Sequence, residues 1–220
     1  MPEYILGIDG GQTSTKLLVA TVDGDIVWGA EVASETGAYA HDRVSAVEGG
    51  FAHLLQEALG SGQWAKTVYQ IVVLGMTGAE PGSPRIPAYR RAAERSVRAR
   101  RHVVVHDAVT NLLGASAGQP GIVVIAGGGA VAHGLTADGH TWTSGGWGYI
   151  IGDEGSGYNV GRAAINAVFR ALDKRTGPTR LTGHILQRFG ACTPVELKYA
   201  IFEGQVSFQD IANWLNQPSR

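Results

Sequence analysis

An aspartate followed by a turn rich in glycine and hydroxyl residues is the first group that could do chemistry. Asp9 ends a predicted strand, and residues 10–16 read Gly-Gly-Gln-Thr-Ser-Thr-Lys. Glycines allow successive backbone N–H groups to point at an anion, and hydroxyls and Lys16 can add donors. A carboxylate beside phosphates can hold Mg²⁺, which usually keeps several waters. The alternative is a plain hairpin with a solvated aspartate, and the Gly-Lys-Ser/Thr ending of a Walker A loop is absent.

A second glycine turn follows a second apolar strand. Residues 122–125 read Ile-Val-Val-Ile, and residues 127–129 are all glycine. Each strand and glycine turn is followed by a second strand, an Asp-Gly turn (at residues 23–24 and 138–139) and a third strand. This repetition favours two related half-domains facing a cleft, with both glycine turns holding the phosphates of one nucleotide. Taken alone, the second turn is equally compatible with a simple tight hairpin.

Asp107 is a candidate general base. It follows the apolar residues 103–105 and precedes a predicted helix. Aspartate there is a good helix N-cap. It could also accept a proton from a substrate hydroxyl, which typically contributes ~10²–10⁴-fold to a rate. The two roles are compatible, and His106 beside it is expected to be structural.

A glycine-dense segment, residues 144–157, contains the adjacent acids Asp153 and Glu154 and the aromatic Trp147. Fixed carboxylates among glycines suit recognition of a polyhydroxyl ligand, because carboxylates accept hydrogen bonds from sugar hydroxyls. The alternative is a helix start at which the two acids favour the helix dipole. The spacing does not match Gly-x-Gly-x-x-Gly, which argues against a dinucleotide fingerprint.

The composition and net charge of the chain argue against nucleic acid and membrane partners. The chain has 220 residues, 44% hydrophobic and 17% charged, with a net charge of −1. That charge provides no general attraction to nucleic acid or to anionic membranes. An arginine group interleaves with alanine and valine and is expected to be a solvated helix face. Its members are Arg90, Arg91, Arg95, Arg98, Arg100 and Arg101.

The number of cysteines and the hydropathy of the sequence indicate the cellular compartment of the protein. Cys192 is the single cysteine, so neither an intrachain disulfide nor a multi-cysteine metal site can form. This fits a reducing cytoplasm. We find neither a signal-peptide pattern nor an apolar run of membrane-spanning length. The expected location is therefore the cytoplasm, with no membrane partner.

The first half of the chain reads as an α/β layer. Strands are predicted at residues 4–9, 16–22, 26–32, 71–74 and 103–105, and Asp23-Gly24 suits a type I′ hairpin. Helices are predicted from Val44 to Leu59, with Gly60 as a stop, and over residues 88–100 and 108–117. Strands alternating with helices after an antiparallel meander indicate this class.

The second half begins after residues 118–121 and becomes all helical from Ser156. Helices are expected over residues 160–172 and from Pro178 to near Gly190. Residues 193–196, Thr-Pro-Val-Glu, predict a capping box with proline at the first helical position, and Ser207 opens a last helix. The predicted domains are therefore residues 1–117 and 121–220.

These motifs resemble the N-acetylglucosamine kinase group of the BadF/BadG/BcrA/BcrD ATPase family, within the actin-like superfamily. The resemblance extends to about residue 175, and its most specific part is Gly-Gly-Trp-Gly…Gly-Asp-Glu-Gly-Ser in residues 145–156. Residues 8–13, 106–108 and 126–130 carry the rest. The resemblance implies an α/β fold of two actin-like (ribonuclease H-like) lobes with mixed sheets, the second lobe incomplete at its C-terminus.

The resemblance also implies chemistry, namely transfer of the γ-phosphate of ATP to a hydroxyl of an amino sugar or related hexose, such as N-acetylglucosamine or a glucosamine-like sugar. Asp107 would be the base and Asp9 would organise Mg²⁺. The expected ATP-phosphate contacts are Gly10, Gly11, Gln12, Thr13, Lys16, Gly127, Gly128 and Gly129. The expected sugar contacts are Thr77, Gly145, Gly146 and Asp153.

The sequence departs from the family pattern in three places. At residues 126–131 it reads Ala-Gly-Gly-Gly-Ala-Val, so Gly128 and Val131 lack side-chain donors that the family uses on phosphate and acetamido groups. Residues 34–40 lack the family's usual sugar-contacting asparagine. The sequence stops at Arg220, before the further strand and adenine-binding glycines that the resemblance implies. The dehydratase activators of this family have a cysteine cluster that this sequence lacks.

Two other hypotheses stay open. The chain could be a non-catalytic sugar- or nucleotide-binding protein or truncated actin-like ATPase module, which calorimetry would reveal as binding without turnover. It could also be a nucleotide-operated interaction module, which would hydrolyse ATP without dependence on a sugar. The expected partners are a small-molecule sugar and, as an open alternative, a second copy in a homodimer, without nucleic acid.

Overall fold

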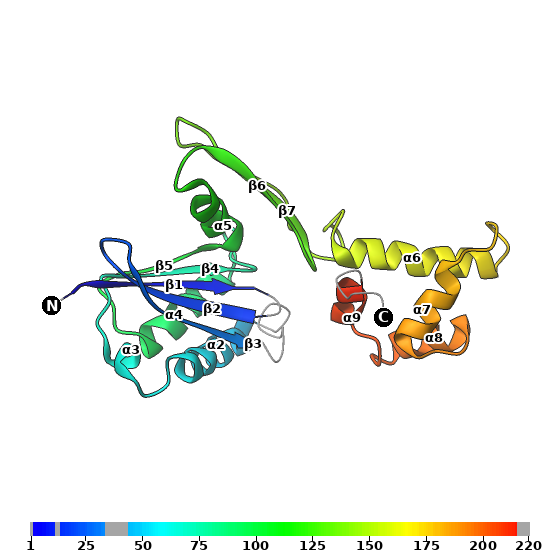
Figure 1. The fold of residues 1–220 in the computed structure, drawn as a ribbon, viewed down its shortest axis with the longest axis horizontal. Helices are drawn as coiled ribbons and strands as arrows, with labels where there is room; N and C mark the ends of the chain where they lie inside the picture. The colour runs from blue at the N-terminus through cyan, green and yellow to red at the C-terminus, as the bar shows by residue number, and fades with distance from the viewer. Residues whose placement is uncertain (1, 12–13, 34–43, 215–220) are drawn as a thin grey trace. The chain divides into compact units, whose positions relative to one another are not determined.

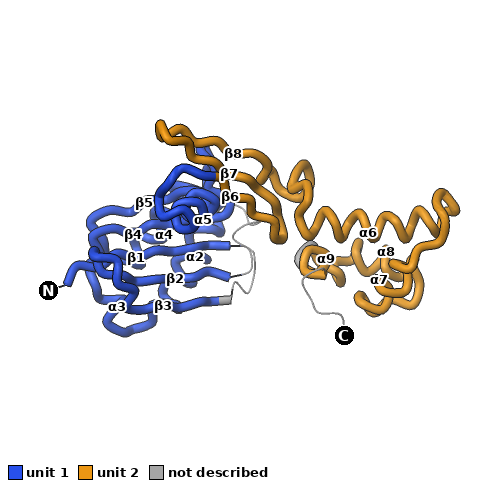
Figure 2. The backbone as a smooth tube through the Cα atoms, turned by 45° about the horizontal axis from the view of Figure 1, so that its top comes forward, with its two compact units in different colours: residues 1–121 blue, residues 122–220 orange. Residues whose placement is uncertain are grey.

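The computed structural model describes residues 2–11, 14–33 and 44–214. The chain divides into two compact units, residues 1–121 and 122–220 (Figure 2). Gln12, Thr13 and residues 34–40, all named above, lie outside the described residues.

The first unit is built on a mixed five-stranded sheet with strand order β3-β2-β1-β4-β5. Strands β1, β2 and β3 form the expected antiparallel meander, whereas β4 runs parallel to β1 and β5 runs parallel to β4. The bounds are β1 Tyr4–Gly10, β2 Ser14–Thr21, β3 Ile26–Ala33, β4 Ile71–Met76 and β5 His102–His106. The expected α/β class with a mixed sheet is confirmed.

Helices cover both faces of this sheet (Figure 1). Helices α2, α3 and α4 lie on one side and α5 on the other; their bounds are α2 Val44–Leu59, α3 Gln63–Lys66, α4 Arg85–Ser96 and α5 Asp107–Ser116. The core between the sheet and α2 and α4 contains Phe51 and Tyr89, whose rings meet edge to face at 5.4 Å. Burial of these apolar side chains stabilises the packing of α2 and α4 on the sheet.

Helix α4 begins and ends earlier than the sequence suggested. The prediction was residues 88–100, but the helix starts at Arg85 after Pro84 and stops at Ser96. Pro87 fits inside the first turn because the first helical N–H groups have no intrahelical partner. Val97 turns to extended backbone, and its amide closes the helix on the carbonyl of Ala93 at 2.8 Å.

The first Asp-Gly turn is not the type I′ turn expected from its dipeptide. A type I′ turn needs positive φ at both central residues, but here Gly24 alone has it, at φ +100°, and Asp23 does not. The amide of Gly24 donates to the carbonyl of Thr21 at 3.0 Å, and the amide of Thr21 donates to that of Asp25 at 2.9 Å. This is a type I turn closed by a glycine bulge, which also matches the twist of the flanking strands.

The second Asp-Gly turn has the same backbone hydrogen bonds as the first. Gly139 has φ +84° and donates to the carbonyl of Thr136 at 3.1 Å, and the amide of Thr136 donates to the carbonyl of His140 at 2.9 Å. The threonine hydroxyl accepts from the amide four residues later in both turns, at 3.2 Å in the first and 3.0 Å in the second. The repeated unit therefore extends to matching side-chain and backbone bonds.

The second unit joins a three-stranded sheet, in the order β6-β7-β8, to a cluster of helices. Its elements are β6 Gly121–Ala126, β7 Ala130–Leu135, β8 Thr141–Gly145, α6 Gly157–Leu172, α7 Leu181–Phe189, α8 Pro194–Phe202 and α9 Phe208–Asn213. Ile165, Ile185 and Leu197 bring α6, α7 and α8 together in an apolar core. Within the described ranges, we find no helix long and apolar enough to span a bilayer.

Three helix starts in this unit differ in detail from the sequence prediction. Helix α6 begins at Gly157 rather than residue 160, because the Ser156 hydroxyl caps it by accepting from the amide of Asn159 at 3.1 Å. Helix α7 begins at Leu181 rather than Pro178, because the Thr179 hydroxyl accepts from the amide of Leu181 at 3.2 Å and holds the chain in a turn.

The third difference concerns the capping of α8. The Thr193 hydroxyl accepts from the amide of Glu196 as predicted, at 3.2 Å. The Glu196 carboxylate, however, accepts from the amide of Cys192 at 2.7 Å instead of that of Thr193, so the box is displaced by one residue. The fully reciprocal capping box belongs to α9, where Ser207 and Asp210 satisfy each other's backbone amides. Ser207 therefore opens the last helix, as expected.

Candidate active site

The carboxyl ends of β1, β4 and β5 meet at one edge of the first sheet. Gly10 pairs with Met76, and Met76 pairs with His106, so the three strands end in register. Thr77 and Asp107 are the next residues along β4 and β5, and the amide of Thr77 donates to the carbonyl of Gly10 at 3.0 Å. Ligands of α/β sheets bind outside such carboxyl ends.

Asp107 is held by hydrogen bonds to both carboxylate oxygens. Its Oδ2 accepts from the Thr77 hydroxyl at 2.8 Å, and its Oδ1 accepts from the amide of Ala108 at 2.8 Å. Its backbone carbonyl accepts from the side chains of Thr110, at 2.8 Å, and Asn111, at 2.9 Å. The expectation that Asp107 is the N-cap is wrong: it is the first helical residue of α5, and His106 occupies the cap position.

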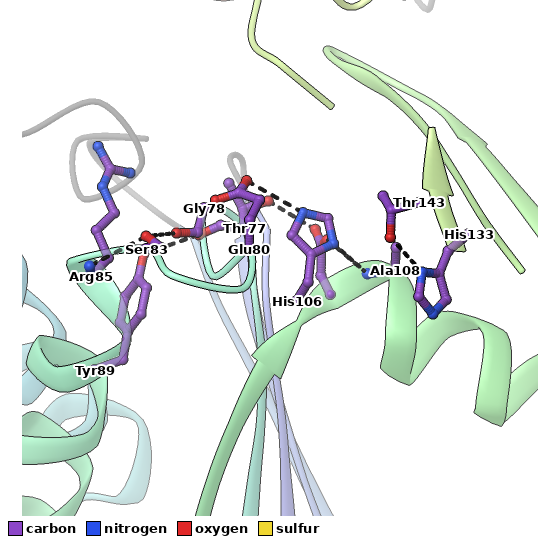
Figure 3. A network of polar contacts seen from close by, with 11 residues as sticks. Thr77, Gly78, Glu80, Ser83, Arg85, Tyr89, His106, Ala108, His133 and Thr143 are labelled. Atoms are coloured by element: carbon purple, nitrogen blue, oxygen red, sulfur yellow. Dashed lines mark hydrogen bonds and ion pairs between the residues drawn. The ribbon is translucent and has the colours of Figure 1, made fainter. Parts of the chain in front are cut away.

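His106 lies between two carboxylates. Its Nδ1 is 3.0 Å from Oδ1 of Asp107, and its Nε2 is 3.6 Å from Oε1 of Glu80. The second distance exceeds a hydrogen bond, so we treat it as an ion pair. Figure 3 shows His106 between Glu80 and the start of α5. The His106 and Asp107 side chains are only 12% and 17% exposed, so water screens them weakly.

The proton on Nδ1 of His106 must be assigned, because the amide of Ala108 also lies 3.2 Å from that atom. An unprotonated Nδ1 would accept from this amide, whereas a protonated one donates to Asp107. We assign the proton to Nδ1. The amide has a shorter bond to Oδ1 of Asp107, and two flanking carboxylates favour a ring protonated at both nitrogens.

The pKa of His106 is raised and the pKa of Asp107 is lowered. Burial opposes charge on His106, but pairing with Asp107 and then with Glu80 outweighs it and raises the pKa of His106 to about 9. Burial likewise opposes charge on Asp107, yet the bonds from His106, Thr77 and the amide of Ala108 leave its pKa below the ordinary value. Asp107 is therefore a carboxylate at neutral pH.

Asp9 has the opposite tendency. Burial first, and the negative charge of Asp107 second, raise the pKa of Asp9, and Lys16 only partly offsets them. Lys16 is directly across from Asp9 on β2. Two neighbouring carboxylates with too little positive charge between them are a setting that suits a divalent cation. In the described ranges, no three acidic, histidine or cysteine side chains gather as a ready-made metal site. Mg²⁺ would therefore depend on Asp9, phosphate oxygens and water.

A turn after β4 supports Thr77. The buried Tyr89 hydroxyl donates to the carbonyl of Thr77 at 3.2 Å. The Ser83 hydroxyl donates to the carbonyl of Gly78 at 2.7 Å and accepts from the amide of Arg85 at 3.3 Å (Figure 3). These bonds connect the start of α4 to the residue that contacts Asp107.

In the second unit, the glycine turn of residues 127–129 packs against the start of α6 and the segment before it. The carbonyl of Gly127 accepts from the amide of Gly157 at 2.8 Å. The buried Asp153, at φ +58°, lies against Gly129, where an added Cβ would come within 2.9 Å of its carboxylate. Gly128 belongs to the same turn. This close approach explains why Gly129 carries no side chain.

Two further predicted residues reach the same part of the second unit. The amide of Gly146 donates to the carbonyl of Ala130 at 2.8 Å, and both Gly145 and Gly146 have positive φ, at +78° and +75°. A Cβ on Gly145 would approach the carbonyl of Ala130 to 3.1 Å. The alternative, a helix start at which Asp153 and Glu154 favour the helix dipole, stays a prediction: α6 starts at Gly157, and both acids lie before its cap, Ser156. Trp147 is largely exposed.

The predicted residues therefore form two groups, one in each unit. Asp9, Gly10, Gly11, Thr77 and Asp107 lie at or beside one edge of the first sheet. The second-unit group comprises Gly127, Gly128, Gly129, Gly145, Gly146 and Asp153. That both turns hold one nucleotide stays a prediction.

Sequence reasoning missed Glu80 and Tyr89 and treated His106 only as structural. The position of His106 directly before Asp107 was a usable signal. Glu80 and Tyr89 gave none, because each reaches the site only through the turn that follows β4.

The mixed sheet and its acidic edge define an α/β protein of the actin-like type. Residues 6–212 match the BadF/BadG/BcrA/BcrD ATPase family. The chain belongs to this family.

Two named relatives are similar in sequence. An N-acetylmuramic acid/N-acetylglucosamine kinase of Clostridium acetobutylicum is 31% identical over 96% of this chain and 68% of its own length. An N-acetyl-D-glucosamine kinase of Dictyostelium discoideum is 26% identical over 84% of this chain and 60% of its own length. The chain thus spans about two thirds of these relatives.

Solved structures agree with the fold. A structure described as a putative N-acetylglucosamine kinase from Chromobacterium violaceum has a TM-score of 0.76 and 26% identity, covering 98% of this chain and 73% of that one. A second, from Porphyromonas gingivalis, has a TM-score of 0.73 at 19% identity, covering 97% of this chain and 71% of that one, and supports the fold alone. The expected actin-like sugar-kinase fold is confirmed.

Proposed function

We propose that this chain acts as an ATP-dependent kinase that phosphorylates a hydroxyl of an amino sugar or related hexose of the N-acetylglucosamine type. The observation that carries the proposal is Asp107, a partly buried carboxylate kept ionised at the carboxyl ends of parallel strands. The names of the relatives agree with this activity, and the family is one of ATPases.

In this proposal each residue has a limited task, because phosphoryl transfer depends mainly on alignment and charge neutralisation. Asp107 accepts the hydroxyl proton as the sugar oxygen attacks the γ-phosphorus, and ADP leaves. Thr77 orients the carboxylate through its bond to Oδ2. The two glycine turns hold the phosphates of ATP, and Lys16 adds positive charge.

The proposal includes Mg²⁺, which would supply charge neutralisation for the phosphates. Asp9 would hold it, because burial and Asp107 leave the Asp9 carboxylate short of positive charge. Asp153, Gly145 and Gly146 would contact the sugar from the second unit. A small-molecule sugar is the expected partner.

The decisive experiment measures ADP release with ATP and Mg²⁺ over a panel of amino sugars and hexoses. We expect turnover with one or a few sugars, and Asp107→Asn should lower kcat by roughly 10²–10⁴-fold. Asp25→Asn, an exposed aspartate in the first hairpin, is the matched control and should behave like wild type.

Other results would favour the rival functions. Sugar binding by calorimetry without ADP release would indicate a non-catalytic binding protein, for which the side-chain-poor turn at residues 126–131 is the motivation. ADP release independent of any sugar would indicate a nucleotide-operated module. Full activity in a folded Asp107→Asn variant would remove the base assignment.

A further inference from the structure

The Asp107 carboxylate has unequal oxygens. Oδ1 faces two donors, Nδ1 of His106 at 3.0 Å and the amide of Ala108 at 2.8 Å. Oδ2 has one hydrogen bond, from the Thr77 hydroxyl at 2.8 Å. A carboxylate oxygen has about two lone-pair positions. Oδ1 is therefore filled, and Oδ2 keeps one position for a further proton donor.

His106 itself is held from its far side. Glu80 contacts Nε2 of His106 at 3.6 Å, and the carbonyl of Glu80 accepts from the amide of Ser83 at 2.8 Å, within the turn that also positions Thr77. The imidazole therefore has one carboxylate beyond each nitrogen. Thr77 follows β4 and His106 is the last residue of the adjacent parallel strand β5, so the same register places both donors on Asp107.

We propose that His106 is a positioning residue: its ring, lying between Glu80 and Asp107, occupies Oδ1 of Asp107 and leaves Oδ2 as the oxygen that receives the substrate proton. This inference rests on the proposed kinase function and assigns the reactive oxygen within it. His106 does not contact the reacting atoms. Its loss would let the carboxylate rotate, and displacement of a catalytic group by about 1 Å can cost ~10²-fold in rate.

The charges around His106 support this role. The facing groups are Glu80 from the turn, Asp107 from α5, and, beyond them, Arg85 from α4 beside Glu80 and Asp9 from β1 beside Asp107. The two nearest groups are negative, and they raise the pKa of His106 to about 9. A charged ring also lowers the pKa of Asp107 and so keeps the base ionised in mild acid.

Kinetics of His106 variants test the inference. His106→Ala should lower kcat roughly 10- to 100-fold with little change in the KM for ATP, and it should move the acid limb of kcat/KM to higher pH. His106→Asn places an amide donor near the former Nδ1. It should recover most of kcat but not the acid limb, because the charge is absent. His53→Asn, an exposed histidine on α2, is the matched control.

A second readout does not depend on activity. In the NMR spectrum of the full chain, the His106 ring, identified by its loss in His106→Asn, should titrate near pH 9. Asp107→Asn and Glu80→Gln should each lower that value. If wild type shows no sugar-dependent ADP release, the kinase proposal fails, but this titration still decides whether the ring is held by both acids.

The inference is overturned by either of two results. One is a folded His106→Ala enzyme with the kcat and pH profile of wild type. The other is a His106 ring that titrates at an ordinary value, near 6.5, and does not respond to Asp107→Asn. Circular dichroism of each variant separates loss of positioning from loss of fold.

Discussion

Asp9 and Asp107 are neighbouring carboxylates whose pKa values are driven in opposite directions. Burial and the charge of Asp107 raise that of Asp9, whereas donors from His106, Thr77 and Ala108 overcome burial and lower that of Asp107. Carboxylates whose surroundings separate their pKa values are suited to different roles. In the proposed function, this contrast supports proton transfer by Asp107 and a bound cation at Asp9.

If Asp9 holds Mg²⁺, its loss should change the metal dependence of turnover. Asp9→Asn should raise the Mg²⁺ concentration needed for half-maximal turnover by at least roughly 10-fold, in the range seen when metal sites lose a supporting group. EDTA should stop turnover in wild type. The measurement is ADP release against Mg²⁺ concentration, with Asp25→Asn as the control. An unchanged Mg²⁺ requirement would exclude Asp9 as the residue that holds the metal.

The raised pKa of His106 also predicts how stability depends on pH. A group that binds its proton more tightly when folded stabilises the fold fully below its unfolded pKa, near 6.5, and this contribution is lost as pH rises to about 9. The shift corresponds to at most roughly 3 kcal/mol, and solvent screening reduces it. For Asp107, whose pKa is lowered, the contribution is instead present above 3.8 and lost in acid.

Urea unfolding measures this effect. The difference in unfolding free energy between wild type and His106→Asn should be larger at about pH 6 than at about pH 9.5. A difference that stays constant over that range would show that His106 is not charged in the folded state.

At the scale of elements, close packing of α5 on β4 holds the base in place. Gly75 of β4 faces Thr110, and a Cβ at Gly75 would come within 2.1 Å of the Thr110 hydroxyl oxygen. That hydroxyl also donates to the backbone carbonyl of Asp107. The glycine therefore permits the approach that fixes the first turn of α5.

Gly75→Ala should destabilise the protein by about 1–3 kcal/mol through overpacking. Adding Thr110→Ala should return part of the loss. The matched control is Gly50→Ala in the interior of α2, where an added Cβ meets nothing within 4 Å; it should stabilise the helix by roughly 0.5–1 kcal/mol. Chemical denaturation gives all three values, and a neutral Gly75→Ala would contradict the packing argument.

At the scale of the whole molecule, the two units share a repeated strand, turn and strand pattern, with matching bonds in both Asp-Gly turns. If both glycine turns bind one nucleotide, ATP with Mg²⁺ should slow amide hydrogen exchange at residues 10–11 and 127–129 together. Asp107→Asn should keep this protection, because the base does not bind phosphate. Protection confined to one unit would contradict the two-turn hypothesis.

Much of the fold could be predicted because it depends on local patterns. Apolar runs located β1, β4 and β6, and helical spacing followed by Gly60 bounded α2 correctly. Turn geometry was less accessible. The Asp-Gly dipeptide suggested a type I′ turn, but the structure has a type I turn with a glycine bulge. The turn type and the pairing register of the two flanking strands depend on each other, so the dipeptide alone does not determine the turn.

The candidate acids of the first unit could be proposed from the sequence because they stand next to strand ends. The apolar runs before Asp9 and Asp107 are visible in the sequence. Glu80 and Tyr89 could not be proposed, since their contacts depend on where the turn after β4 folds back.

The order of strands and helices, the duplicated glycine turns and the candidate acids could be recognised in the sequence, because hydrophobic period and turn residues act over a few neighbours. The atoms that meet could not be recognised there: they follow from the parallel register of β1, β4 and β5, the approach of Glu80 to His106 and the bond from Thr77 to Asp107. Those contacts join residues that are far apart in the chain, and strand pairing brings them together.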